Sequence, residues 1–479
     1  MWLILILLLT IFLVVLWYVD TRKPNNFPPG PKWLPIIGCA WELRNLHKEK
    51  GTLSEATQEL AAKYGSVVGA KVGRKLTVFV YGSKAYKELL SKDDLNGRPD
   101  DIFATSRTFG KRREQKKFLM HQLKEIGFHK AVLEEILAEQ VRAIIHDIKK
   151  TIDDDGVICA TNFFSVHILD TLHILMTGDT CGDEEMEELH KAMNSFAANI
   201  LITGMLFSHF PFLRYICPDY CGYNTYVNIH KRIIAFISKK VKMLKEICGS
   251  QPSRGFIPAY LEKLNSVKGK SSFSEEQMLA TCLDLLVAGF DSTCNTLGFV
   301  FLYLLLHPEV QERAQEEIES VIGRGRPPTL EDRTRLPYVE CIVLESLRMF
   351  MGRALVVPRR AMKDSTLNGY FIPKGTILQG NARGTLLDES AGWENPEAFN
   401  PERFMKDGAL CIPDNFIPFS SGRRRCVGDI LARSNIFLIV ASLLQTFNFR
   451  SLPGSPPKVD IVEGFTPSVK PFKAFVTLR

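Results

Sequence analysis

The sequence predicts a mainly α-helical protein with minor β-structure, folded as one large domain behind a short N-terminal segment. Apolar residues recur at helical spacing along most of the chain, and β-rich segments occur only toward its two ends. This pattern does not suggest an alternating α/β sheet. The chain has 479 residues, 46% of them hydrophobic, which is enough for a large core. No Gly/Ser-rich linker, low-complexity tract or internal repeat divides it.

Residues 1–20 are expected to form a transmembrane signal anchor. The run from Trp2 to Val19 is apolar, with Thr10 its one clearly polar member. About 18 such residues can span a bilayer. Arg22 and Lys23 follow the run and no charged side chain precedes it, so the positive-inside rule places the rest of the chain in the cytosol. A cleaved signal peptide is the alternative, but it would need a basic start and a small-residue cleavage site.

Residues 21–38 predict a proline-rich hinge, and residues 39–479 a single catalytic domain. The hinge contains the stretch Phe27-Pro-Pro-Gly-Pro31. Proline fixes its own φ angle, so this stretch is expected to set the angle between the anchor and the domain.

The elements of the domain follow from periodicity and turn signals. Two long helices are expected within 271–323, meeting at His307-Pro308, and Ser274 with Gln277 offers a capping box for the first. A hairpin around Gly73 and short strands before residue 377 supply the β-structure. The remaining helices are predicted at 53–64, 115–149, 163–176, 184–207, 227–247, 336–350 and 429–447, the hairpin at 67–81 and the short strands within 356–377.

Charge and cysteine content narrow the function. The net charge of +7 suits docking to an acidic protein or an anionic membrane surface. Aromatic and basic residues do not interleave in a stripe, so a nucleic-acid partner is not expected. The eleven cysteines show no disulfide rhythm, which favours a reducing compartment. Cys217 and Cys221 form a CxxxC without a second Cys/His pair nearby, so a zinc site is not expected.

A glycine-framed loop around Cys426 is the strongest candidate site. Gly422 and Gly428 let the backbone turn tightly and lie close to a flat cofactor. Backbone N–H groups in such a loop can stabilise a thiolate, and a helix start just beyond it lowers the thiol pKa. Arg424 can meet a cofactor carboxylate. A buried structural cysteine is the alternative, but Phe419 and the other three residues all stand at the offsets that a ligand loop requires.

This loop resembles the heme-binding loop of the cytochromes P450, which are heme-thiolate monooxygenases. The resemblance extends over nearly the whole chain. It implies the mainly helical P450 fold, heme b as the cofactor and Cys426 as the iron ligand, with Phe419, Gly422, Arg424 and Gly428 as cofactor-binding residues. The proline-rich stretch resembles the hinge of microsomal members. Together with Asp20-Thr-Arg-Lys-Pro and residues 367–376, it resembles the insect branch with juvenile-hormone-type and ecdysteroid-type oxidases.

A polar break interrupts the first of the two long helices. Ala288-Gly289 is followed by Asp291-Ser292-Thr293 between strongly apolar flanks. Glycine costs a helix about 1 kcal/mol relative to alanine, and Asp, Ser and Thr compete for backbone hydrogen bonds. A local opening of the helix is therefore expected, with room for O₂ and water and an acid beside a hydroxyl to relay protons. The alternative is a polar surface turn.

The break resembles the oxygen-activation motif of P450 enzymes. Asp291 takes the acid position and Ser292 the position of the usual threonine. A catalytic role is expected for both and for Thr293. Glu345 and Arg348 stand three apart on one predicted helix, and with Arg403 they match the family's buried charge triad, which has a structural and heme-supporting role.

One segment departs from the family pattern. Residues 108–117 lack the Trp-x-x-x-Arg element, because Arg112 takes the Trp position and Lys116 the Arg position, and the preceding loop is short. Lys116 could hold a heme propionate as a point charge, or be a solvated lysine. Arg98 and Arg359 resemble further propionate-binding residues.

The resemblance implies a monooxygenase that inserts one oxygen atom of O₂ into a lipophilic substrate, by hydroxylation or epoxidation. Electrons would come from NADPH through a flavoprotein reductase, attracted by basic residues around the Cys loop and at 111–117. The expected location is the endoplasmic-reticulum membrane, with the catalytic domain in the cytosol. Two alternatives stay open: an oxygen-independent heme-thiolate isomerase or dehydratase, and a catalytically impaired heme-binding protein.

Overall fold

Helices form most of the described chain, with small sheets beside them, so the predicted fold class is confirmed. The computed structural model describes residues 2–106, 109, 116–126, 131–161, 163–247, 255–266 and 273–479. The principal helices are α1 (Trp2–Thr21), α2 (Ala40–Lys50), α3 (Leu53–Tyr64), α4 (Ser83–Ser91), α5 (Ile102–Ser106), α6 (Lys116–Ile126), α7 (Ala131–Asp154), α8 (Ser165–Thr177), α9 (Asp183–Asn199), α10 (Leu206–His209), α11 (Leu213–Ile216), α12 (Tyr223–Ile247), α13 (Phe256–Ser266), α14 (Glu275–Leu306), α15 (Pro308–Val321), α16 (Pro337–Met351), α17 (Arg383–Leu386) and α18 (Asp429–Thr446).

In the described ranges the strands form two larger sheets and several two-stranded ribbons. The first sheet has the order β1-β2-β7-β4, and β2 and β7 run parallel. The second has the order β10-β13-β3. The strands are β1 (Val67–Val72), β2 (Lys75–Val80), β3 (Val157–Cys159), β4 (Arg359–Arg360), β5 (Ser365–Leu367), β6 (Tyr370–Ile372), β7 (Ile377–Gly380), β8 (Met405–Lys406), β9 (Ala409–Leu410), β10 (Phe447–Ser451), β11 (Ile461–Val462), β12 (Ser468–Val469) and β13 (Lys473–Leu478).

Most of the sequence predictions of local structure are confirmed. The helix at 53–64 has the predicted bounds, and the hairpin of β1 and β2 turns at Gly73, whose φ is +60°. The side chain of Ser274 accepts a hydrogen bond from the Gln277 N–H and caps α14, and Pro308 begins α15. The predicted helix at 184–207 is wrong in its length, because α9 ends at Asn199 and α10 begins seven residues later. The short helices of the described chain that were not predicted are α2, α4, α5, α11, α13 and α17.

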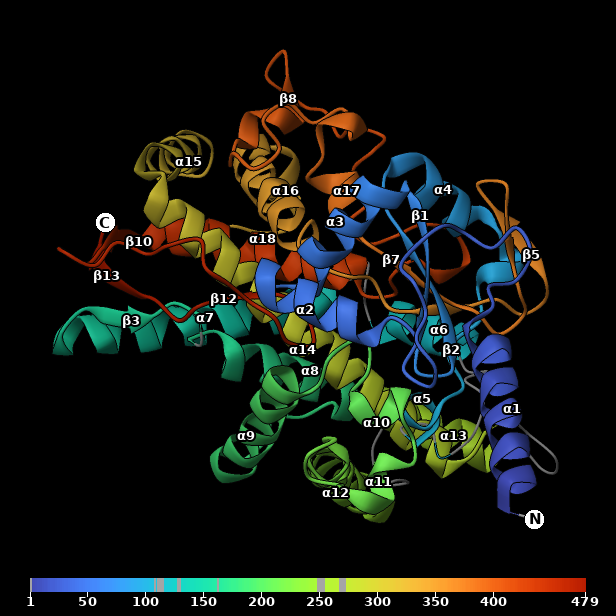
Figure 1. Cartoon of the computed structure of the whole chain (residues 1–479). Coiled ribbons are helices and arrows are strands. Elements are labelled where there is room, and N and C mark those ends of the chain that lie inside the picture. Colours follow the sequence, from blue (N-terminus) through green and yellow to red (C-terminus); the bar gives the residue numbers. More distant parts are fainter. Residues whose placement is uncertain are drawn as a thin grey trace.

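The central helix α14 runs through the middle of the molecule and α18 crosses it (Figure 1). The helices α8 and α16 also pack against it, so most of its side chains are buried. The expected local opening at Gly289 is wrong, because α14 is helical from Glu275 to Leu306 without interruption. A Cβ at Gly289 would lie 2.7 Å from Leu172 Cδ2 on α8. The glycine therefore serves the close approach of two helices.

Three helices of the described chain are long and apolar enough to cross a membrane. The helices α14 and α18 are largely buried inside the fold, whereas the apolar stretch of α1 is exposed and the helix projects from the body of the molecule (Figure 1). Asp20, near the end of α1, accepts a 2.7 Å hydrogen bond from the Ile36 N–H and forms a 2.5 Å ion pair with Lys71. The end of α1 is therefore attached to the segment at Ile36 and to β1.

Candidate active site

The loop around Cys426 is held in a tight turn. Gly422 has a φ of +67°, and a Cβ there would lie 3.0 Å from the main-chain oxygen of Leu90, so a side chain is disfavoured. The Cys426 N–H donates a 2.9 Å hydrogen bond to the Phe419 carbonyl, which closes the turn. The Cys426 side chain is exposed and α18 begins three residues later, at Asp429. The loop thus presents a thiol beside a helix N-terminus.

Gly428 differs from Gly422. Its φ is −93°, which any residue adopts, and a Cβ there would meet no described protein atom within 4 Å. Packing within the described chain therefore does not require a glycine here. A flat group lying against the loop would, because it needs the space that a side chain fills.

Two arginines converge on Asn96 next to this loop. Arg424 Nε donates a 2.8 Å hydrogen bond to the Asn96 carbonyl, and Arg359 donates to the Asn96 side-chain oxygen. Burial lowers the pKa of both guanidinium groups, and the charge of Arg424 lowers that of Arg359 further. Within the described ranges no carboxylate pairs with either one. Arg98 lies close by and donates a 3.1 Å hydrogen bond to the Pro358 carbonyl.

These residues fit a heme of type b. Its iron accepts a thiolate, which Cys426 would supply. Its two propionates are carboxylates, and buried guanidinium groups are stabilised by such partners. The structure therefore brings together Cys426, Arg424, Arg359 and Arg98. The side chain of Lys116, the first residue of α6, lies outside the described residues, as does Arg112 with its neighbours at 110–115.

One face of α14 is less buried than the rest of that helix. Leu285, Ala288 and Ser292 follow one another at i, i+3 and i+7, so their side chains share a face. Ala288 is exposed and the other two are half-buried, although Phe290 and Thr293 on other faces are buried. The Ser292 hydroxyl donates a 2.7 Å hydrogen bond to the Ala288 carbonyl within the helix.

Asp291 is buried and holds different partners from Ser292. Its carboxylate accepts hydrogen bonds from the Thr466 N–H at 2.9 Å, from the Thr466 hydroxyl at 2.6 Å and from Asn295 Nδ2 at 3.2 Å. Burial raises the pKa of Asp291 to about 6, and the bonds from Thr466 and Asn295 oppose that rise. Asp291 and Ser292 are thus neighbours in the sequence, but their side chains form hydrogen bonds with different groups. Thr466 and Asn295 were not predicted as site residues, because no short-range pattern in the sequence marks them.

The structure brings Glu345, Arg348 and Arg403 into one buried cluster. Arg348 donates two hydrogen bonds to the Glu345 carboxylate, at 2.7 and 2.8 Å, and both side chains are fully buried. Arg403 Nε donates to the same carboxylate at 3.3 Å. The Asn400 N–H adds a fourth donor at 2.8 Å, and Arg348 also donates to the carbonyls of Leu386 and Pro396. The cluster joins α16 to the segment before β8.

Comparisons with known proteins agree with this geometry. The family model described as "Cytochrome P450" matches residues 28–474. The chain is 36% identical to "Probable cytochrome P450 303a1" of Drosophila melanogaster, over 98% of this chain and 97% of that protein. It is 29% identical to "Farnesoate epoxidase" of Bombyx mori, over 97% of each chain. It is 31% identical to "Cytochrome P450 2J2" of Homo sapiens, over 92% of this chain and 89% of the relative.

A match of this extent, together with the cysteine loop and its arginines, assigns both family and general chemistry. The expected enzyme class is confirmed. The chain belongs to the cytochrome P450 family of heme-thiolate monooxygenases.

Proposed function

We propose that this P450 hydroxylates or epoxidises a lipophilic small molecule, with electrons that a flavoprotein reductase draws from NADPH. The observation that carries the proposal is the loop at Cys426, which presents a thiol beside the Asn96-centred arginines. When bound there, heme supplies the iron that takes up and activates O₂ after reduction. The protein residues hold the cofactor, deliver protons and exclude water.

Each candidate residue has a role that its position supports. Cys426 would be the thiolate ligand, and Arg98, Arg359 and Arg424 would pair with the propionates. On α14, burial raises the pKa of Asp291 to about 6, so this carboxyl would take up and release a proton at mildly acidic pH, and Ser292 would present its hydroxyl on the exposed face. The presence of both groups favours the oxygen-dependent reaction over an isomerase or dehydratase. The Glu345–Arg348–Arg403 cluster would keep the segment before the Cys loop in place.

Exposed basic residues beside the loop support docking of an acidic reductase. The side chains of Arg423 and Arg425 are 73% and 67% exposed. Arg425 pairs with Asp429 at 2.6 Å, and Arg423 pairs with Asp93 at 4.0 Å. Positive charge at this position would steer an acidic partner toward the side of the molecule that carries the cysteine.

We further propose that residues 1–20 anchor the chain in the endoplasmic-reticulum membrane, with 21–38 as the hinge and 39–479 as the cytosolic catalytic domain. An exposed apolar face near the hinge would lie on the same membrane. This face has one half at residues 34–41 and the other at residues 212–220, and the turn at Gly73 lies between them. The Gly73 N–H donates a 3.2 Å hydrogen bond to the Ile37 carbonyl, and Gly73 lies against His209. The exposed members are Leu34, Ile36, Trp41, Phe212, Tyr215, Ile216 and Tyr220. Carbonate washing of microsomes should leave the protein in the membrane; recovery in the wash would contradict the anchor.

The decisive test of the cofactor is the absorption spectrum of the reduced, CO-bound protein. The wild-type chain should show the thiolate-ligated spectrum, and Cys426→Ala should lose it. Cys411→Ala is the matched control, because Cys411 is also exposed but lies outside the loop. An unchanged spectrum in Cys426→Ala would overturn the ligand assignment.

Turnover with reductase and NADPH then tests the reaction. The name of the Bombyx mori relative makes farnesoate a rational first substrate. Product that contains one oxygen atom from ¹⁸O₂ would support the proposal. NADPH-independent conversion would favour an oxygen-independent enzyme instead.

A further inference from the structure

A turn close to the C-terminus reaches both the surface and the central helix. This turn, residues 463–467, joins β11 to β12. On its outer side Glu463 accepts a 3.0 Å hydrogen bond from the Leu53 N–H and pairs with His47 at 2.6 Å. In its middle the Phe465 N–H donates a 3.0 Å hydrogen bond to the Ala197 carbonyl of α9. The turn is therefore attached to three separate parts of the fold.

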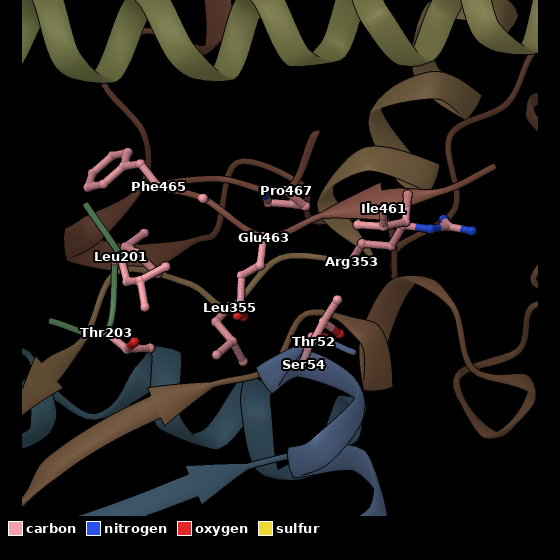
Figure 2. Close-up of a pocket in the computed structure, with 12 residues that line it drawn as sticks. Thr52, Ser54, Leu201, Thr203, Arg353, Leu355, Ile461, Glu463, Phe465 and Pro467 are labelled. Carbon is pink, nitrogen blue, oxygen red and sulfur yellow. The ribbon is translucent and has the colours of Figure 1, made fainter. Parts of the chain in front are cut away.

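The outer side of the turn lines a cavity, and its inner side faces α14. Figure 2 shows Glu463 above the start of α3, with Leu355 and Ser54 across the cavity and Phe465 pointing away from them. The Thr466 side chain contacts Asp291 instead. A Cβ at Gly464 would lie 2.6 Å from the Ala197 carbonyl, so the backbone here is packed too closely to shift freely.

Within the described chain, Thr466 supplies two of the three hydrogen bonds that the Asp291 carboxylate accepts. Its hydroxyl donates to one carboxylate oxygen and accepts a 2.9 Å hydrogen bond from Asn295 Nδ2, which also donates to the other carboxylate oxygen. Asp291 is 4% exposed, and no Lys or Arg of the described chain pairs with it. A buried carboxylate without a cationic partner depends on such neutral donors for its orientation and charge.

We propose that Thr466 is a positioning residue for the P450 reaction, which orients the Asp291 carboxyl and sets how readily that group gives up its proton. The inference rests on the proposed role of Asp291 as the acid on α14. Thr466 does not itself touch substrate or cofactor in this assignment. It acts through Asp291, and Asn295 supports the same geometry.

The surroundings of Asp291 contain few other groups that titrate. Cys294 lies on the same helix, and burial raises the pKa of its thiol, which stays protonated. His190 of α9 packs edge-on against Phe290, with ring centroids 6.3 Å apart. Glu463 and His47 lie on the outer side of the turn, paired with each other. Loss of the Thr466 hydroxyl is therefore expected to act on Asp291 directly.

Thr466→Val tests the proposal because it removes the hydroxyl but keeps the side-chain shape. Infrared difference titration should show the Asp291 carboxyl band, identified by its absence in Asp291→Asn, with its pKa raised by about one unit. The same variant should release several-fold more hydrogen peroxide per NADPH consumed. The pH dependence of this release should shift to higher pH. Thr466→Ser should restore both, and Ser468→Ala, on the same hairpin, should leave both unchanged. If Thr466→Val is unstable, Thr466→Ala serves instead.

The outcomes separate this inference from the proposed function. A wild-type carboxyl titration and wild-type coupling in Thr466→Val would overturn the positioning role. So would a Thr466→Ser variant as impaired as Thr466→Val, because that would indicate a packing effect of the methyl group. Unchanged coupling of NADPH use to product in Asp291→Asn would also overturn the positioning role, because it would show that Asp291 is not the acid on which Thr466 acts. Loss of the thiolate-type CO spectrum in the wild-type chain would instead reject the proposed function.

Discussion

Arg424 Nε donates a 2.8 Å hydrogen bond to the main-chain oxygen of Asn96, 328 positions earlier in the chain. The bond attaches the loop that carries Cys426 to the segment after α4. Asn96 is 3% exposed, and its side-chain oxygen accepts a hydrogen bond from Arg359. Its Nδ2 donates to the Lys92 carbonyl at 3.0 Å, which fixes the orientation of the amide. One buried asparagine therefore positions two of the arginines assigned to the heme propionates.

Asn96→Ala should lower the fraction of purified protein that retains heme. The change leaves the Arg359 guanidinium without its buried acceptor, and a hydrogen bond to a charged group is worth about 1.5–3 kcal/mol. Heme content per polypeptide, measured beside the CO spectrum, checks the prediction. Asn199→Ala is the control, because Asn199 is exposed at the end of α9. Equal heme content in both variants would contradict the role given to Asn96.

Glu345→Gln should destabilise the fold strongly. The substitution leaves Arg348 charged and fully buried without its anionic partner, which typically costs about 3–5 kcal/mol. Urea unfolding monitored by circular dichroism measures the change. Glu187→Gln removes the exposed pair with Lys191 and should leave the midpoint nearly unchanged. Similar midpoints for the two variants would show that the cluster is not a structural centre.

Gly289→Ala and Gly298→Ala should have opposite effects, although both glycines lie inside α14. A Cβ at position 289 would press on Leu172 at 2.7 Å, and overpacking of a core typically costs about 1–3 kcal/mol. A Cβ at position 298 would meet Val469 at an ordinary 3.6 Å, so the higher helix propensity of alanine should stabilise by about 1 kcal/mol. Thermal unfolding of the two variants checks both signs. A stabilised Gly289→Ala would contradict the close helix contact.

The His47–Glu463 pair should make stability depend on pH. The hydrogen bond that the His47 ring donates to the Glu463 carboxylate raises the pKa of His47 above its unfolded value of about 6.5. The contribution is then fully present below that unfolded value and is lost as the pH rises through the raised folded pKa. The stability difference between wild type and His47→Gln should therefore be larger near pH 6 than near pH 8. His146→Gln, at an exposed position of α7, is the control.

Features that depend on neighbouring residues were determined by the sequence alone. The helix Leu53–Tyr64 and the meeting of two helices at Pro308 follow from periodicity and turn chemistry over a few residues. The loop from Phe419 to Gly428 is recognisable for the same reason, because its residues stand at short, constant offsets. The expected opening at Gly289 was wrong because helix propensity counted only the cost of the glycine, not its contact with α8.

Contacts between distant segments were decided only by the tertiary structure. Thr466 reaches Asp291 across 175 positions, and Arg424 reaches Asn96 across 328. No pattern over a few residues marks such a pair, because the partner is chosen by how helices and turns pack. A lone threonine or asparagine reads as an ordinary surface residue until folding buries it beside a charge. The sequence alone was therefore enough to predict the cysteine, the acid and the arginines as site residues. Only the packed fold decided which neutral residues hold them in place.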